Sequence, residues 1–362
     1  MQYITINHNL LNQFIFKVFR NLGFNETESQ NAARVLVTSD LRGIESHGCA
    51  RLHGYIRLVD AGKIKPNAEP FIEREKFSVA TLNADGGLGL HMGSKAMDIA
   101  IEKAEQYGSG WVSVKNSSHF GVAVGHIEKA LEKGMIGFSL TNASPLVAPA
   151  GGRERLLGTN PICIGFPAQK NPPFILDMAT TVVANGKLEV AKRKGDQIPT
   201  GYAQDFEGAT TTDPGILAQG GSMIPLGSDL QHSNYKGYGL GAMVDILTGV
   251  LSGANFGPWV PPFVPFLNQT EEKVGEGIGH FVGVWNIEGF METDEFKRRM
   301  DQWINRFKTS QPAKGIDRVM VAGQKEHELS LDRKANGIPI YKVVWDNLKT
   351  IDERFNIGII ND

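Results

Sequence analysis

Residues 42–58, RGIESHGCARLHGYIRL, hold side chains that could act together on a small anion. His47, Arg51 and Tyr55 are four residues apart. On an α-helix such residues drift by only ~40° per step, so they would project from nearly one stripe. An arginine grips a carboxylate through paired hydrogen bonds, a histidine exchanges protons near neutral pH, and a tyrosine orients an oxygen. The spacing indicates a site for a small carboxylate; the alternative is the solvated face of an amphipathic helix.

A second polar cluster, NSSH at residues 116–119, follows the apolar run WVSVK. Ligands of α/β proteins tend to bind at the carboxyl ends of strands, so His119 is a candidate ligand-binding residue. It could equally be an ordinary residue at a helix N-terminus. His119 and His126 are seven apart and would share a helix face, but no HExxH motif or third ligand accompanies them. We therefore expect no metal site.

Glycine-rich and strand-end segments offer places for a larger ligand. GYGLGA at residues 237–242 fits a relaxed dinucleotide fingerprint, but no apolar strand precedes it and no acidic residue follows ~20 positions on, so a Rossmann site is not expected. Lys236, at the start of the same helix, would suit a phosphate, or the glycines could simply permit close packing. Polar groups also adjoin strands in GTNPICIGFP and FILDMATT, where they could hold a ligand or cap a turn.

The elements that must position these residues have α/β texture. Asn25 and Glu28 form a plausible capping box and Gly23 is placed to end the preceding helix, so the first forty residues predict two helices. A third helix is expected over 42–59, and AGKIKPNAEP marks a boundary. Strands and helices then alternate. Expected strands cover 77–84, 111–115, 136–142, 162–167, 174–179 and 280–287, and expected helices 93–108, 126–135, 236–251 and 294–307.

Composition excludes several classes of protein. The 362 residues carry 37 Lys and Arg against 39 Asp and Glu without a basic run, so nucleic acid is not an expected partner. No secretory signal and no apolar segment of ~20 residues is visible, so we expect a cytoplasmic protein outside the membrane. Cys49 and Cys163 are the only cysteines and should be reduced. Cys49 cannot use His47 as a base on a helix, because residues i and i+2 diverge by ~200°.

An ordered series of motifs between residues 40 and 287 carries a specific resemblance. The motifs are DLRGIESHGCARL with AGKIKP behind it, NSSHFG, GMIGFSLTNASPLVAPAGG, LGTNPICIGFP, LDMATT, TTDP, YKGYGLGAMVDILTGVLSG and GHFVGVWNI. Together they resemble the malate/L-lactate dehydrogenase family of NAD(P)-dependent oxidoreductases, which includes ureidoglycolate and sulfolactate dehydrogenases. The resemblance implies a non-Rossmann α/β fold, with a helical domain (1–75 and 290–362) facing an α/β cofactor domain (76–289). It also implies a homodimer with active sites near the interface.

The resemblance also implies roles for individual residues. His47 and His119 match the two histidines to which family members assign proton transfer, and Ser46, Arg51 and Tyr55 match substrate-holding positions. The strand-end residues Thr159 and Asn160 are added to the substrate site. The expected cofactor-binding residues are Ala143, Asp177, Met178, Ala179, Thr180, Thr181, Lys236 and Gly323. Around Gly323 the sequence AGQ departs from the family's more usual PG pair, which weakens the match there.

The implied activity is that of an NAD(P)-dependent 2-hydroxy acid dehydrogenase, with malate as the first expected substrate and NAD as the first expected cofactor. L-lactate or another 2-hydroxy acid, or reduction of a 2-keto acid or cyclic imine, are alternatives. Arg51 would hold the substrate carboxylate while a histidine takes the hydroxyl proton. We favour His47, because it shares a stripe with Arg51 and Tyr55. An inactive dinucleotide- or anion-binding protein is the alternative from a different class.

Overall fold

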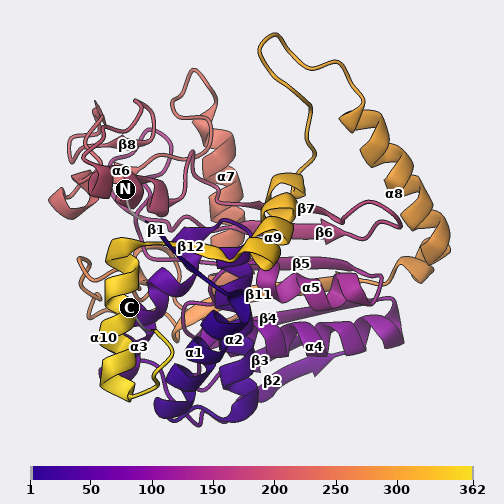
Figure 1. The fold of residues 1–362 in the computed structure, drawn as a ribbon, viewed down its shortest axis with the longest axis horizontal. Coiled ribbons are helices and arrows are strands. Elements are labelled where there is room, and N and C mark those ends of the chain that lie inside the picture. Colours follow the sequence, from indigo (N-terminus) through magenta and orange to yellow (C-terminus); the bar gives the residue numbers. More distant parts are fainter. Residues whose placement is uncertain (1–2, 361–362) are drawn as a thin grey trace.

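A seven-stranded mixed sheet forms the centre of the molecule in the computed structural model, which describes residues 3–360 (Figure 1). Its order is β2-β3-β4-β11-β5-β6-β7, in which only β3 and β4 pair in parallel. The central strands alternate or run apolar, as strands buried beneath helices do. Their bounds are β2 Phe71–Lys76, β3 Val79–Asn83, β4 Ser109–Ser117, β5 Ile136–Thr141, β6 Ile162–Phe166, β7 Phe174–Met178 and β11 Ile278–Trp285.

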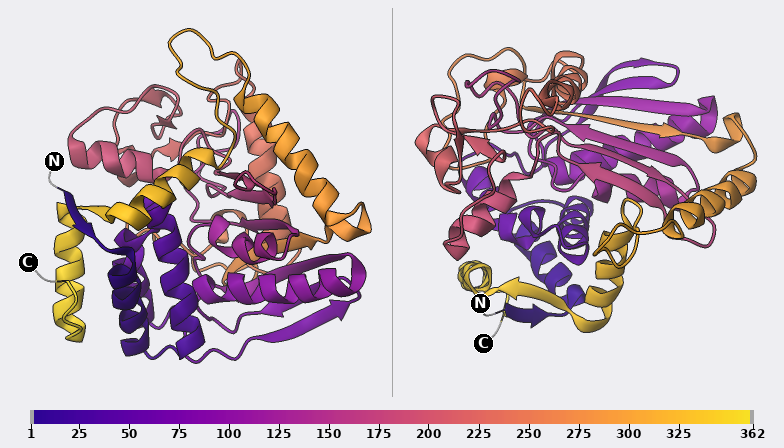
Figure 2. Two further views of the ribbon diagram at one scale, coloured as in Figure 1. Left: turned by 45° about the vertical axis from the view of Figure 1, so that its right-hand side comes forward. Right: turned by 90° about the horizontal axis from the view of Figure 1, so that it is seen from above.

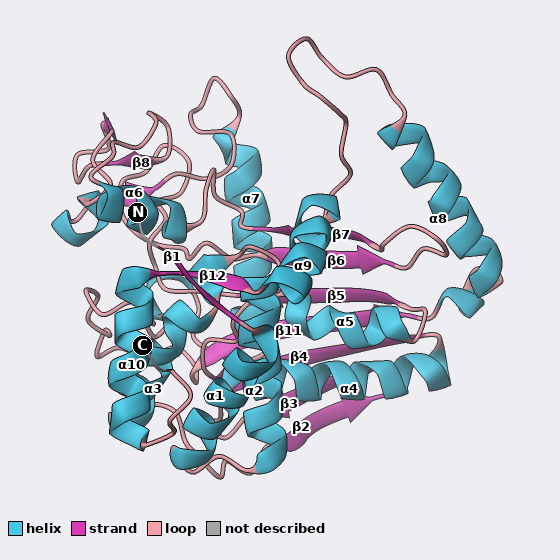
Figure 3. Cartoon of the chain, viewed as in Figure 1, coloured by secondary structure: helices cyan, strands magenta, loops and turns pink. Residues whose placement is uncertain are grey.

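Helices cover both faces of this sheet (Figure 1, Figure 3). Helices α4 (Gly89–Tyr107) and α5 (Val124–Glu132) pack on one face. Helix α7 (Asn234–Asp245) runs on into a π-helical turn, Ile246–Val250, behind the other face. Helix α8 (Thr293–Lys308) stands outside the β6–β7 hairpin, against which Trp303 packs edge-on. The two-faced cover makes the sheet the rigid support for loops at its edge.

The two ends of the chain build a helical layer beside the sheet. The antiparallel pair β1 (Tyr3–Ile6) and β12 (Ile338–Tyr341) joins them, and both ends lie together in two views (Figure 2). One continuous apolar core runs from these helices to the sheet. The helices of this layer are α1 His8–Asn21, α2 Glu26–Leu41, α3 Leu52–Asp60, α9 Gln324–Asn336 and α10 Lys342–Phe355.

A small lobe with its own core lies beside the sheet edge. It contains helix α6 (Asn185–Lys194) and the three-stranded sheet β10-β8-β9. Leu188 of α6 is buried in this second apolar cluster, which is separate from the main one. The three strands are β8 Ala203–Gln204, β9 Thr210–Thr211 and β10 Ser222–Met223. Backbone hydrogen bonds join the lobe to the segment between β5 and β6: the Met223 N–H donates to the Leu146 carbonyl at 2.8 Å, and the Ala148 N–H donates to the Met223 carbonyl at 3.3 Å.

Most expected elements are confirmed, including the Asn25–Glu28 capping box and the turn at Gly23, whose φ is +93°. The short strands β1, β2, β8, β9, β10 and β12 were not expected. Their segments are brief or exposed, so they carry no clear period. Among residues 3–360, no helix has the length and apolar character that crossing a membrane requires.

The expected helix over 42–59 is wrong in its first half. The chain instead makes two 3₁₀ turns, Glu45–His47 and Cys49–Arg51, before α3 begins at Leu52. The buried carboxylate of Asp40 causes the break, because it accepts the Cys49 backbone N–H at 2.7 Å. It lies where a side chain on Gly48 would be, since a Cβ there would come within 1.8 Å of Asp40 Oδ1. Periodicity could not reveal this contact across nine residues.

Candidate active site

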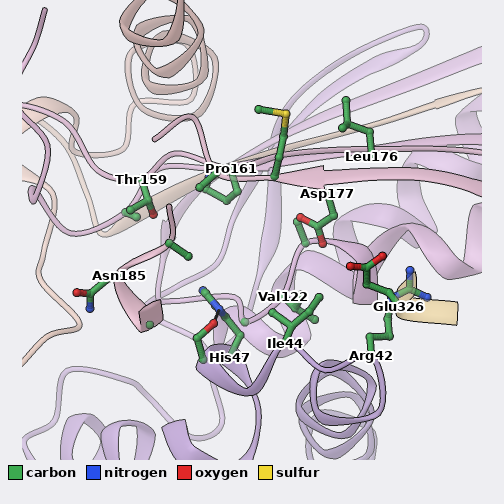
Figure 4. Close-up of a pocket in the computed structure, with 18 of the residues that line it drawn as sticks. Arg42, Ile44, His47, Val122, Thr159, Pro161, Leu176, Asp177, Asn185 and Glu326 are labelled. Atoms are coloured by element: carbon green, nitrogen blue, oxygen red, sulfur yellow. Dashed lines mark hydrogen bonds between the residues drawn. The ribbon is translucent and has the colours of Figure 1, made fainter. Parts of the chain in front are cut away.

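A cavity of about 430 Å³ opens between the 3₁₀ turns, the end of β7 and the first residues of α6 and α9. This volume is within the ~300–1,000 Å³ typical of ligand sites. Figure 4 shows His47 towards one end of the cavity and Arg42 with Glu326 towards the other. The predicted site residues that line it are Ser46, His47, Arg51, His119, Ala143, Thr159, Asp177, Met178, Ala179 and Gly323.

Two histidine rings face each other at this cavity. The rings of His47 and His119 are stacked, with centroids 5.8 Å apart and planes inclined by 17°. His47 Nδ1 lies 2.8 Å from Ser46 Oγ, and His119 Nδ1 lies 2.6 Å from the hydroxyl of Tyr55. Each ring is thus oriented by a neighbouring hydroxyl, as a group that must move a proton requires.

Hydrogen bonds distinguish the two rings. The backbone N–H of Gly121 donates to His119 Nδ1 at 3.3 Å, so this nitrogen must be an acceptor. Neutral His119 therefore carries its proton on Nε2. His47 Nδ1 faces only the Ser46 hydroxyl, which can accept a hydrogen bond as well as donate one. His47 is free to carry its proton on Nδ1 and leave Nε2 as a base.

Burial keeps both rings neutral. Desolvation, with a smaller effect of the nearby Arg51 charge, lowers the pKa of His47 to about 4. Desolvation, followed by the effects of His47 and Arg51, holds the pKa of His119 well below its usual value. At neutral pH each ring can therefore accept a proton.

Arg51 already grips a carboxylate in this structure. Its Nη1 and Nη2 donate to Glu189 Oε1 and Oε2 at 3.2 and 3.0 Å, and its Nε donates to the Ser46 carbonyl at 2.5 Å. This is the planar, two-bond geometry by which guanidinium groups recognise carboxylates. The side chain thus has the right form for an acidic substrate, although Glu189 of α6 occupies it.

The single helical stripe expected for His47, Arg51 and Tyr55 is wrong. His47 and Arg51 stand in separate 3₁₀ turns, and Tyr55 is fully buried behind His119. Tyr55 therefore touches the site through His119 and is not among the residues lining the cavity. The three side chains still converge, because the Asp40 contact folds the turns against α3.

Other predicted residues lie outside the cavity lining. Asn160 is buried, with its amide bonded to the Ala143 N–H and the Gly241 carbonyl. Thr180 and Thr181 donate to backbone carbonyls, so the three hold strand-end loops in place. Lys236 is exposed on α7. The phosphate seat expected at that helix start is therefore not part of this cavity.

Arg42 is a cavity residue that motif reasoning missed. Only 8% of it is exposed, and its buried Nε has no hydrogen-bond partner among the described residues. Nearby, α9 begins at the left-handed Gly323 with no side-chain cap, and Lys325 also lines the cavity. Uncapped helix N–H groups and a guanidinium with an unsatisfied Nε–H suit an anionic ligand. The same RGIESHG segment contains Arg42, but nothing in its spacing points to this role.

Asp177 lies close to Arg42 at this end. Its carboxylate accepts the Val124 N–H at 3.0 Å and so caps α5. Burial raises the pKa of Asp177 to about 6, and Arg42 partly offsets that rise. Its charge therefore helps to balance the buried guanidinium.

Neither metal binding nor thiol chemistry has support in residues 3–360. The structure contains no cluster of three or more metal-ligating side chains in this range. The helix face expected to join His119 and His126 is wrong, because His119 precedes α5 while His126 lies on it. Burial, with Asp40 beside it, raises the pKa of the Cys49 thiol well above its usual value. A thiolate nucleophile is thereby disfavoured.

Comparison with known proteins identifies the family. The profile of the malate/L-lactate dehydrogenase family matches residues 6–349. A malate dehydrogenase of Pyrococcus abyssi is 43% identical, over 98% of this chain and 96% of that protein. An L-sulfolactate dehydrogenase of Methanocaldococcus jannaschii is 37% identical, over 96% of each. The solved malate dehydrogenase of Pyrococcus horikoshii superposes with a TM-score of 0.89 at 39% identity, covering 98% and 96%.

The chain therefore belongs to the malate/L-lactate dehydrogenase family. It is a dehydrogenase that acts on hydroxy acids, with the mixed α/β fold of this family. The resemblance seen in the motifs and the fold class expected from it are both confirmed.

The lowered pKa of His47 can be tested in the ligand-free protein. Because burial penalises the charged ring, its ¹⁵N chemical shifts should titrate near pH 4 and not near the ~6.5 of an exposed histidine. Histidine-labelled protein measured by NMR from pH 3.5 to 8 gives this midpoint, and the signal missing from His47→Asn assigns the ring. A midpoint at or above 6.5 would contradict the burial argument.

Proposed function

We propose that this enzyme interconverts malate and oxaloacetate with a nicotinamide cofactor. The main support is the pair of neutral histidines that line the cavity together with Arg51, whose guanidinium already binds the carboxylate of Glu189. The relatives named malate dehydrogenase, matched over nearly the whole chain, favour malate over other 2-hydroxy acids. The relatives named sulfolactate dehydrogenase make a sulfonated acid the second candidate.

The residues at the Arg42 end fit the anionic part of a dinucleotide. The orphaned Nε of Arg42, Lys325 and the uncapped start of α9 would hold its phosphates. The backbone of Asp177–Ala179 borders the same cavity and would hold the nicotinamide side. When bound, the cofactor supplies hydride exchange at substrate C2, while the protein supplies position and proton transfer. We propose NAD as the preferred cofactor, with NADP as the alternative.

In the proposed oxidation, Arg51 binds the substrate carboxylate and His47 Nε2 takes the hydroxyl proton. The Ser46 hydroxyl accepts from His47 Nδ1 and keeps the required tautomer. His119 donates from Nε2 to the substrate oxygen, since Gly121 and Tyr55 occupy its Nδ1. Exclusion of bulk water around these half-buried rings when the ligands bind would strengthen each of these interactions.

Separate replacement of the two histidines tests this division of roles. His47→Asn should lower kcat by ~10²–10⁴, the usual contribution of a positioned base. His119→Asn, which retains a hydrogen-bond donor, should lower kcat less. Steady-state rates of malate oxidation at several pH values measure both. Near-normal turnover by His47→Asn would show that His47 is not the base and would assign that role to His119.

The substrate assignment is tested by a rate panel. NADH and NADPH are each followed at 340 nm with oxaloacetate, pyruvate, sulfopyruvate and a cyclic imino acid. We expect the highest kcat/KM with oxaloacetate and NADH. A higher value with sulfopyruvate would favour the second candidate, and no turnover with any of them would exclude the proposal.

We also propose that the enzyme is a homodimer. Helix α7 and the turns that follow it expose a group of large apolar side chains, and such groups often mark a contact with another protein. The members of this group are Tyr235, Tyr238, Leu240, Met243, Ile246, Val250 and Leu251. Light scattering should give about twice the chain mass of 39.5 kDa, and Ile246→Asp should lower it. A monomer at micromolar concentration would contradict this assignment.

Two expectations remain predictions. The domain division at residues 75 and 290 predicts separate protease-resistant pieces after limited digestion. The expected cytoplasmic location is tested by cell fractionation, in which the protein should appear in the cytoplasmic fraction.

A further inference from the structure

We propose that Glu189 occupies the substrate-carboxylate position in the free enzyme and must leave Arg51 before substrate binds. The proposal rests on the proposed function, in which Arg51 receives that carboxylate. It makes Glu189 a residue that sets substrate affinity without taking part in the reaction.

The bonds of Arg51 leave little room for a second carboxylate. Ser46 takes its Nε–H, and Glu189 takes one N–H from each of its two terminal nitrogens. A guanidinium grips a carboxylate most tightly with paired, parallel N–H groups. Once Ser46 has accepted the Nε–H, the two terminal nitrogens of Arg51 are the pair of donors left for a carboxylate. Glu189 accepts from both of them.

Glu189 is not a stray surface group. Its Oε1 also accepts from Asn185 Nδ2 at 2.9 Å, and its Oε2 lies 3.4 Å from Arg193. These partners lie on α6 and stay with Glu189 when α6 moves. When Glu189 separates from Arg51, its carboxylate therefore keeps two partners on α6, the Asn185 amide and the Arg193 charge.

The first residues of helix α6, Asn185 and Gly186, form part of the cavity wall. The helix starts directly over the 3₁₀ turn, where a Cβ on Gly186 would come within 2.3 Å of Ser46 Cβ. The close packing of α6 against Ser46 therefore requires glycine at position 186. The opposite side of α6 buries Leu188 in the small lobe, whose core is separate from the main core. Because Leu188 does not belong to the main core, a shift of α6 would carry Glu189 away from Arg51 without opening that core.

The charges make the exchange selective. A substrate carboxylate replaces Glu189 with an equal charge and the same paired geometry, so Arg51 is never left unpaired in its partly buried site. An ester or amide of the same acid offers no such charge. Glu189 therefore discriminates against uncharged analogues.

Titration with oxalate, an inert dicarboxylate, tests this exchange by calorimetry in the presence of NADH. Glu189→Gln removes the competing charge and should lower the oxalate Kd about five-fold or more, the range expected for a partly exposed ion pair. The KM for oxaloacetate should fall in parallel, with kcat little changed. Glu189→Asp keeps the charge with a shorter reach and should give an intermediate Kd.

Asp196→Asn is the matched control. This exposed residue follows α6 and undergoes the same loss of one acidic charge, and its Kd should match the wild type. Tight oxalate binding by Glu189→Gln alone would support the proposal even if the wild type binds none. A Kd that is unchanged or weaker in Glu189→Gln would overturn it, and Glu189 would then be a positioning residue for Arg51. Absence of turnover with every acid would instead count against the proposed function, because oxalate binding needs no reaction.

Discussion

The buried carboxylate of Asp40 fixes the geometry on which the site depends. It accepts the Cys49 N–H at 2.7 Å, at the end of α2, and forces the chain into two short turns before α3. Burial raises the pKa of Asp40 to about 7. Arg333 of α9 donates to the Asp40 carbonyl and to Glu45, at 2.5 and 3.0 Å. The N-terminal turns and the C-terminal helix are thereby held as one wall of the cavity.

The cavity beside this wall is lined by two histidines and by an arginine towards each end. Burial keeps His47 and His119 neutral, so they can exchange protons, while Arg42 and Arg51 present guanidinium groups that bind anions. Arg51 lines the cavity close enough to the two rings for its charge to act on them. Arg42 lies beside Glu326 of α9 (Figure 4). An acid and a longer anionic ligand can therefore meet in the cavity, with their reacting parts near the two rings.

The sequence predicted the large sheet well, because its strands and the amphipathic helices that cover them have clear periods and caps. The strand that leads to Asp177 is one example, and in the helical layer the Asn25–Glu28 capping box of α2 is another. It failed where a distant contact overrides a local pattern. Helical spacing suggested one stripe for His47, Arg51 and Tyr55, and the Asp40 contact abolishes it. Motifs likewise pointed to Lys236, which the fold leaves exposed, and gave no sign of Glu189 or of the unpaired Arg42 nitrogen.

The proposed reaction transfers hydrogen directly between C2 of the hydroxy acid and a nicotinamide bound in this cavity. Oxidation of malate deuterated at C2, followed by mass spectrometry of the isolated reduced nicotinamide, detects this transfer. We expect one deuterium in the nicotinamide for each malate oxidised, because in the proposed reaction His47 removes only the hydroxyl proton and the C2 hydrogen does not exchange with water. Deuterium recovered in the solvent, with an unlabelled nicotinamide, would contradict the proposed reaction.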